Sequence, residues 1–166
     1  MNRTEIIDLL SAYKVNKARA QYLDQKCLSQ QEYIERLRQT ALQDSIHITQ
    51  NLFHTPSGND HSSPVENLAI NVADGHLPSY IIEEYHQLSQ KWLEAREAWR
   101  KVKIADFLLD ALTDKERFVI EGKYVNDIPF THLEKKGEQQ FGYYISIEGI
   151  RKIRNSALIK LCQVCE

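Results

Sequence analysis

One short segment of the sequence carries a dense set of hydrogen-bonding side chains at helical spacing. Within residues 146–161, one face holds a carboxylate, three cations and an amide: Glu148, Arg151, Lys152, Arg154 and Asn155. Guanidinium, ammonium and amide groups donate to phosphate oxygens and to acceptors on base edges, and a carboxylate accepts from the amino group of cytosine. The chemistry that this set predicts is recognition of double-stranded DNA.

A single amphipathic helix must position these groups. Ser146 is a preferred residue type at a helix N-cap, so the helix is predicted to begin directly after it. Apolar residues recur at helical spacing on the other face: Ile147, Ile150, Ile153, Ala157, Leu158 and Leu161. One buried face and one face of long polar side chains suit the major groove, which is wide enough to admit a helix.

Two shorter helices are predicted to support this one. The first begins at Thr113-Asp-Lys-Glu116, which has the pattern of a capping box. It ends at Ile128-Pro129, because proline lacks an amide donor and disfavours helical geometry in the residue before it. The second runs from about Phe130 to Lys136 and ends at Gly137, which leaves residues 137–145 as an irregular connection. The three helices stand in the order of a helix-turn-helix.

The segment Ser146-Ile-Glu-Gly-Ile-Arg-Lys-Ile-Arg-Asn-Ser-Ala-Leu-Ile-Lys-Leu161 resembles the recognition helix in the fourth region of bacterial sigma factors and of sigma-like phage regulators. The helix that opens Leu112-Thr-Asp-Lys-Glu-Arg117 and runs to Lys-Tyr-Val125 matches the same pattern. The whole layout resembles phage late-gene regulators of the RinA and ArpU type. This resemblance implies transcription regulation, with DNA and RNA polymerase as partners. The connection over residues 137–145 is longer than is usual in that family.

The position of each polar residue along the helix determines the contact expected of it. Early solvent-facing positions approach base edges, so Glu148 is expected to accept from cytosine and Arg151 to donate to guanine. Lys152, Arg154 and Asn155 are expected to hold phosphates or to mix both roles. The resemblance implies base and backbone contacts directly after the serine cap, at Glu148, Arg151 and Lys152. The supporting helix adds three candidate backbone contacts: Thr131, Lys135 and Lys136. In the alternative interpretation, these charges form the solvated face of an ordinary amphipathic helix.

Composition and charge set wider limits. The 166 residues, 42% of them apolar, suffice for one moderate core or two small ones. The net charge of −2 argues against a generally basic nucleic-acid coat, so attraction to phosphate must come from a local excess of cations. Three cysteines and no recognisable signal peptide favour a reducing cytoplasm, and no apolar run is long enough to span a bilayer. Scarce strand signals predict an all-α fold.

Residues 1–111 are predicted to form a helical bundle, followed by the helix-turn-helix domain over 112–166. A helix over about Thr4 to Lys26 is expected to form a hairpin with a second helix, which starts at the capping-box pattern Ser29-Gln-Gln-Glu32 and runs to about residue 52. Residues 54–63 form a polar loop rich in helix breakers. A short helix is predicted from Ser63-Pro64 to about Gly75.

A long helix is predicted from about Ser79, because apolar residues recur there in alternating steps of four and three. They are Ile81, Tyr85, Leu88, Trp92, Ala95, Trp99 and Val102. Such a seam packs within a helical bundle or pairs two copies of a chain. Intrachain packing is favoured. The alternative is a homodimer interface formed by Ile81, Tyr85, Leu88, Trp92 and Trp99, which would present two recognition helices to one site.

The remaining residue patterns in the sequence do not predict a catalytic site. Cys162-Gln-Val-Cys165 has the spacing of a metal knuckle, but no second pair accompanies it, so two apolar thiols at a helix end are the favoured interpretation. No phosphate loop, nucleophile elbow or triad is found, and no enzyme activity, metal or cofactor is expected. The leading hypothesis is a sequence-specific transcriptional regulator. Its alternatives are a DNA-packaging adaptor similar to small terminase subunits, and a helical scaffold that binds only protein.

Overall fold

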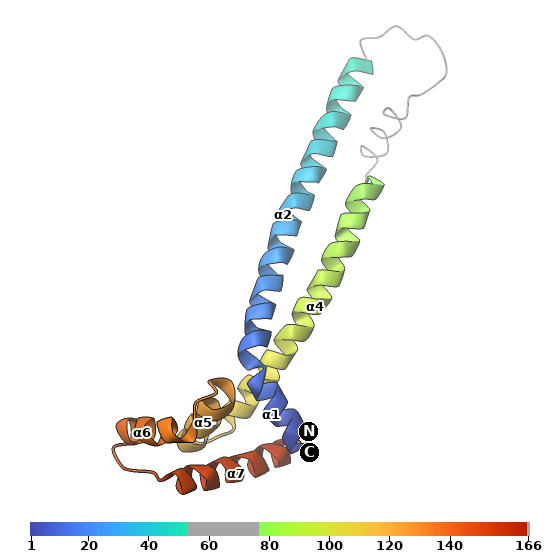
Figure 1. Cartoon of the computed structure of the whole chain (residues 1–166). Helices are drawn as coiled ribbons and strands as arrows, with labels where there is room; N and C mark the ends of the chain where they lie inside the picture. Colours follow the sequence, from blue (N-terminus) through green and yellow to red (C-terminus); the bar gives the residue numbers. More distant parts are fainter. Residues whose placement is uncertain (53–76, 166) are drawn as a thin grey trace. The chain divides into compact units, whose positions relative to one another are not determined.

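The computed structural model describes residues 1–52 and 77–165, apart from the side chains of 45–52. Every regular element in these ranges is a helix, which confirms the all-α prediction (Figure 1). The elements are α1 (Arg3–Ser11), α2 (Tyr13–Leu52), α4 (Ser79–Asp110), α5 (Asp114–Ile120), the π-helix η1 (Glu121–Val125), α6 (Phe130–Phe141) and α7 (Ile147–Val164). The polar loop at 54–63 and the short helix predicted to end near Gly75 lie outside the described residues.

The chain divides into two compact units. One unit contains residues 22–95, and the other combines residues 1–21 with residues 96–166. The predicted helix-turn-helix segment, 112–166, therefore lies wholly within the second unit. It shares this unit with α1 because Ile6 and Leu10 belong to the same buried cluster as Leu158 of α7.

The unit of residues 22–95 is a pairing of α2 with α4, which run antiparallel (Figure 1). Cys27 and Ile34 of α2 form a buried cluster with Ile81 and Leu88 of α4. One polar side chain, Gln30, is buried among them, and both ends of its amide group form hydrogen bonds. Its amide nitrogen donates to the Glu84 carboxylate at 2.9 Å, and its carbonyl accepts from Lys91 at 2.6 Å. A buried amide with both ends paired costs little and fixes the register of the two helices.

The predicted hairpin within the first 52 residues is wrong. The chain breaks at Ala12 instead of near residue 27, and Ser29 and Glu32 lie in the middle of α2 rather than at a helix start. The physical reason is burial. Cys27 and Ile34 continue one apolar stripe across the expected break, and this stripe is covered by α4. Such tertiary packing outweighs a local capping signal, which stabilises a helix only where the helix happens to begin.

The long helix predicted from Ser79 is confirmed as α4. Its seam is used mainly inside the chain, as the favoured interpretation expects. Ile81 and Leu88 are buried by α2, Tyr85 and Trp99 are half-buried, and Trp92 remains 42% exposed. A homodimer through Ile81 and Leu88 would therefore first require α2 to leave. Of the residues predicted for that interface, Trp92 stays exposed on the folded chain.

Two apolar clusters hold the other unit together. The larger one joins α1, the end of α4, the last residue of α5 and the C-terminal half of α7. Its buried members are Ile6, Leu10, Ala105, Leu108, Leu109, Leu112, Ile120, Ala157, Leu158 and Leu161. The smaller one joins α5, α6 and the first turn of α7 through Val119, Leu133 and Ile150. Because α7 contributes to both clusters, its rotation about its own axis is fixed at two points.

Gly122 permits the close contact between η1 and α6. A Cβ atom built on Gly122 would overlap the side chain of Leu133, which is fully buried. The π-helical turn that contains Gly122 ends at Asn126, and Asp127 follows with a positive φ of 48°. Pro129 then precedes α6. The sharp change of direction between α5 and α6 thus depends on a residue without a side chain.

A pair of glycine substitutions tests this close contact. Gly122→Ala is expected to lower the free energy of unfolding by about 1–3 kcal/mol, because the added methyl must displace a core leucine. Gly137→Ala is the matched control: its Cβ would meet Phe118 at an ordinary 3.5 Å in the interior of α6. There we expect no loss, or a gain of about 0.5–1 kcal/mol. Urea denaturation followed by circular dichroism measures both; equal losses would contradict this account.

The start of α5 makes stability depend on pH. Thr113 and Glu116 form the predicted capping box: the Thr113 amide donates to the Glu116 carboxylate at 3.0 Å. This bond, with smaller contributions from the Thr113 hydroxyl and from Lys160 of α7, lowers the pKa of Glu116 below its ordinary value, although burial opposes the shift. Because the pKa is depressed in the folded state, the stabilisation is complete near neutral pH. It is lost as the pH falls through the folded-state pKa.

Glu116→Gln keeps an oxygen that can accept from the Thr113 amide but loses the negative charge and the pair with Lys160, so it is expected to destabilise the chain by about 0.5–1 kcal/mol near neutral pH. The difference from the unaltered chain should shrink as the pH falls below the ordinary range of a carboxyl group. Glu138→Gln is the control, since Glu138 is an exposed acid of α6. Thermal unfolding from neutral to acid pH checks this. A difference that stays constant with pH would show that the carboxylate charge contributes nothing.

Candidate nucleic-acid interface

The connection into α7 is shorter than the sequence suggests. The prediction that the supporting helix ends at Gly137 is wrong, because α6 continues to Phe141. Gly137 is buried inside this helix, in contact distance of Phe118 and Ile145. The helix ends instead at Gly142, which has a φ of 71° that L residues rarely adopt. Four residues, 142–145, then lead to the N-cap of α7, which is the short turn typical of a helix-turn-helix.

The orientation predicted for α7 is confirmed. The side chain of Ser146 accepts from the amide of Gly149 at 3.2 Å and caps the helix. Ile150 and Leu158 are fully covered, whereas the side chains of Glu148 and Arg151 are exposed. Lys152 and Asn155 are exposed as well. The polar face is thus free on the outside of the unit, as a helix that enters a groove requires.

Three cations converge on one aromatic ring beside this face. The guanidinium carbons of Arg151 and Arg154 lie 5.8 and 5.5 Å from the centroid of the Phe130 ring, and the ammonium of Lys123 lies 5.7 Å from it. Phe130 is half-buried and packs against the Val119–Leu133–Ile150 cluster, so the ring is fixed by the core. Cation–π attraction at these distances holds the charges in place.

Lys123 and Phe130 were not predicted as site residues. Lys123 comes from η1, Phe130 from the start of α6 and the two arginines from α7, so no spacing in the sequence connects them. Lys123 also pairs with Asp127 at 3.3 Å, but that carboxylate is almost fully exposed and the pair is correspondingly weak. The result is a local excess of positive charge on a chain whose net charge is −2.

Arg3 is a further cation that the sequence did not predict. Its guanidinium donates to the side-chain oxygen of Asn155 at 3.1 Å, and Arg154 donates to the same oxygen at 2.8 Å. The N-terminal helix therefore adds a charge to the surface of α7. Because the oxygen of Asn155 is occupied, its amino group is left as the outward donor, which suits an acceptor such as a phosphate oxygen.

Glu148 and Lys152 form an ion pair one turn apart, at 3.5 Å. Both side chains are 78% exposed, so the pair stabilises the helix by at most a few tenths of a kcal/mol. Breaking it to make contacts with a ligand costs little. Glu148 and Lys152 are therefore accessible, as their predicted roles require.

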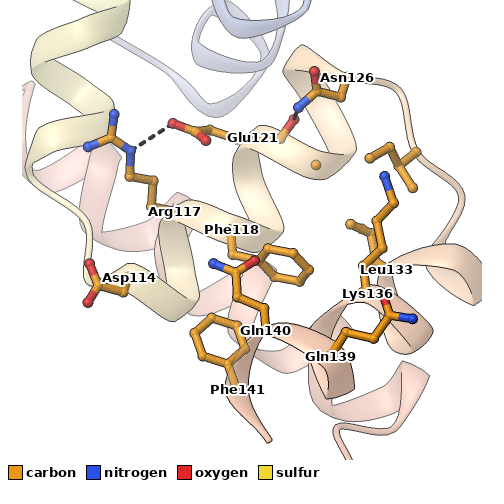
Figure 2. A pocket seen from close by; sticks show the side chains of 12 residues that line it. Asp114, Arg117, Phe118, Glu121, Asn126, Leu133, Lys136, Gln139, Gln140 and Phe141 are labelled. Atoms are coloured by element: carbon orange, nitrogen blue, oxygen red, sulfur yellow. Dashed lines mark hydrogen bonds and ion pairs between the residues drawn. The ribbon is translucent and has the colours of Figure 1, made fainter.

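In the described residues, no hydrogen bond, ion pair or ring contact joins the other predicted contact residues, Thr131, Lys135 and Lys136, to the cations around Phe130. Thr131 is exposed next to Phe130, and Lys135 is exposed on α6. Lys136 lines an open groove between α5, η1 and α6, together with Gln139 and Gln140 (Figure 2). In that groove Arg117 is neutralised by Glu121 at 2.7 Å and by Asp110 at 3.1 Å. The cations brought together are thus those around Phe130, and the roles of Thr131, Lys135 and Lys136 stay predictions.

The aromatic residues near the turn into α7 make contacts within the unit. Phe141 packs edge-on against Phe118, with ring centroids 5.4 Å apart, as expected for a core residue. Tyr143 is covered on one side by the ammonium of Lys115. Tyr144 donates to Glu134 at 2.6 Å, and this hydrogen bond raises the pKa of Tyr144. None of these rings takes part in the cluster around Phe130 in the part of the chain described.

Among residues 1–52 and 77–165, no three histidine, cysteine or acidic side chains gather in a way that would hold a metal ion. Cys162 and Cys165 are half-buried and pack against the larger apolar cluster, as predicted for thiols at a helix end. In the same ranges, no helix combines the length and apolar character needed to cross a membrane. Comparison with protein-family models, curated proteins and solved structures gives no match.

Proposed function

We propose that this chain binds double-stranded DNA through the exposed face of α7. The observation that carries the proposal is the orientation of that helix. Its apolar side is covered by two clusters, and Glu148, Arg151 and Lys152 point outward directly after a short turn and a serine cap. Hydrogen-bonding side chains on the first turns of such a helix are those that contact base edges in the major groove.

The charge distribution supports the same proposal. Arg151 and Arg154 pair with none of the described carboxylates; they are held instead by the ring of Phe130. A ring attracts a cation without neutralising it, so the charge stays available for phosphate. A solvated helix face, the alternative interpretation, needs no such convergence of cations from two elements on one ring.

The more particular proposal is a sequence-specific transcriptional regulator that resembles phage late-gene activators. It rests on the resemblance of residues 112–161 to sigma-like helix-turn-helix modules, and the four-residue turn removes the one departure from that pattern. On this proposal the chain acts in the cytoplasm, contacts a promoter-proximal site and has RNA polymerase as a further partner. A homodimer is a further proposal, and Trp92 is the member of the predicted interface that stays exposed for it.

Selection of bound duplexes from a random pool provides the test, followed by fluorescence anisotropy at several salt concentrations. Arg151→Ala is expected to cost about 1–3 kcal/mol on the selected duplex and to relax preference at one base pair. Lys152→Ala should weaken selected and random duplexes alike and reduce the salt slope by about 1. Lys101→Ala is the control, since Lys101 pairs with Glu97 on α4.

Equal and small effects of Arg151→Ala and Lys152→Ala on both kinds of duplex would refute the roles assigned to α7. Two other outcomes would select the alternatives. A closed ring with loose sequence preference would indicate a packaging adaptor. Absence of any salt-dependent duplex binding would indicate a scaffold that binds only protein.

Phe130 offers a separate test of the cation cluster. Phe130→Leu keeps an apolar side chain against Val119 and Leu133 but removes the ring that holds the two arginines. Their side chains must then be ordered on binding, so duplex affinity is expected to fall about three- to tenfold. Phe130→Tyr, which keeps a ring, should bind within about twofold of the unaltered chain. If Phe130→Leu binds more tightly, the arginines leave the ring in the complex and positioning by Phe130 is wrong.

A further inference from the structure

A second cationic surface lies on α4, distinct from the residues assigned to DNA. Six side chains line one open groove along this helix: Arg96, Trp99, Arg100, Lys103, Ile104 and Phe107. At 100° per residue they fall on one face, opposite the face on which Ala98, Val102, Ala105 and Leu109 are buried. We call these six residues the basic–aromatic face. Five of the six side chains are exposed, and Trp99 is half-buried.

Two apolar residues of this face are exposed side by side. Phe107 is 63% exposed and Ile104 is 37% exposed, and they are neighbours on adjacent turns of the helix. Single exposed apolar residues are common, but an exposed phenylalanine beside an isoleucine, within a groove, leaves a continuous apolar strip in water. Covering such a strip is favourable by roughly 25 cal/mol per Å² of apolar surface removed from water.

The cations of this face are unpaired. Within residues 1–52 and 77–165, Arg96, Arg100 and Lys103 form no ion pair, whereas neighbouring Lys101 pairs with Glu97 and Asp106 accepts from Tyr13 at 2.7 Å. Positions 96, 100, 103 and 107 follow steps of four, three and four. This is the spacing with which one helix contacts another along a coiled-coil seam.

We propose that the basic–aromatic face docks an acidic amphipathic helix of a partner protein. Carboxylates of the partner would pair with Arg96, Arg100 and Lys103, and its apolar side chains would cover Ile104 and Phe107. A nucleic-acid backbone supplies the negative charge but little apolar surface for Phe107. A symmetric pair of this chain would place the same three cations of each copy against each other, which is repulsive.

The test uses the full chain and a synthetic helical peptide of about three heptads, with leucine along one face and glutamate at the flanking positions. A second peptide with glutamine in place of every glutamate isolates the charge. Labelled-peptide anisotropy gives the affinity, and amide chemical shifts of the chain locate the site. The glutamate peptide is expected to bind at least about tenfold more tightly than the glutamine peptide, and to shift residues 96–107.

Two variants and one control locate the interaction. Arg100→Glu and Phe107→Ser should each weaken peptide binding about tenfold, since one reverses a contact charge and the other removes the exposed ring. Lys101→Glu makes the same charge change on the same helix, outside the face, and should change the affinity less than about twofold. All three should leave duplex binding unchanged, so this inference and the DNA proposal fail independently.

Several results would overturn the inference. One is absence of peptide binding; another is equal weakening by Arg100→Glu and Lys101→Glu, which would show only a general attraction between opposite charges. Binding of anionic vesicles or of duplex DNA that Arg100→Glu abolishes would assign the face to a membrane or to nucleic acid. Concentration-dependent self-association that Phe107→Ser removes, measured by sedimentation, would assign it to a second copy of the chain.

Discussion

The candidate interface depends on the burial of α7 in two apolar clusters at once. Ile150 is held by α5 and α6 near the start of the helix, and Leu158 and Leu161 are held by α1 and the end of α4. One cluster would leave the helix free to rotate or tilt, whereas two clusters along the same side determine which residues face solvent. This arrangement requires α6 to lie close to η1, and the missing side chain of Gly122 permits that approach.

The cations of this unit are of two kinds. Arg117 and Lys160 are paired with carboxylates and belong to the scaffold; Lys160 ties α7 to Glu116 at the start of α5. Arg151 and Arg154 lie against an aromatic ring and keep their charge available. A chain with a negative net charge thus presents a positive surface locally, because three cations gather around Phe130 and two of them pair with no described carboxylate.

The long helix α4 carries two different apolar surfaces, one in each unit. On its inner side Ile81 and Leu88 are covered by Cys27 and Ile34. Further along α4, in the other unit, the side opposite the buried residues carries Phe107 among unpaired cations. A long helix that is buried on one side and apolar in part on the other offers a second surface without any change in its own packing.

Sequence alone determined the features that depend on neighbouring residues: the cap at Ser146, the capping box at Thr113 and the periodic apolar side of α7 that orients Glu148 and Arg151. Caps and helical periodicity act over one or two turns, so they can be predicted without knowing the packing. Only the tertiary structure decided that α2 continues through Ser29, that Gly137 lies inside a helix, and that Lys123, Phe130 and Arg3 join α7. Each of these depends on a partner distant in sequence, because burial against that partner outweighs the local signal.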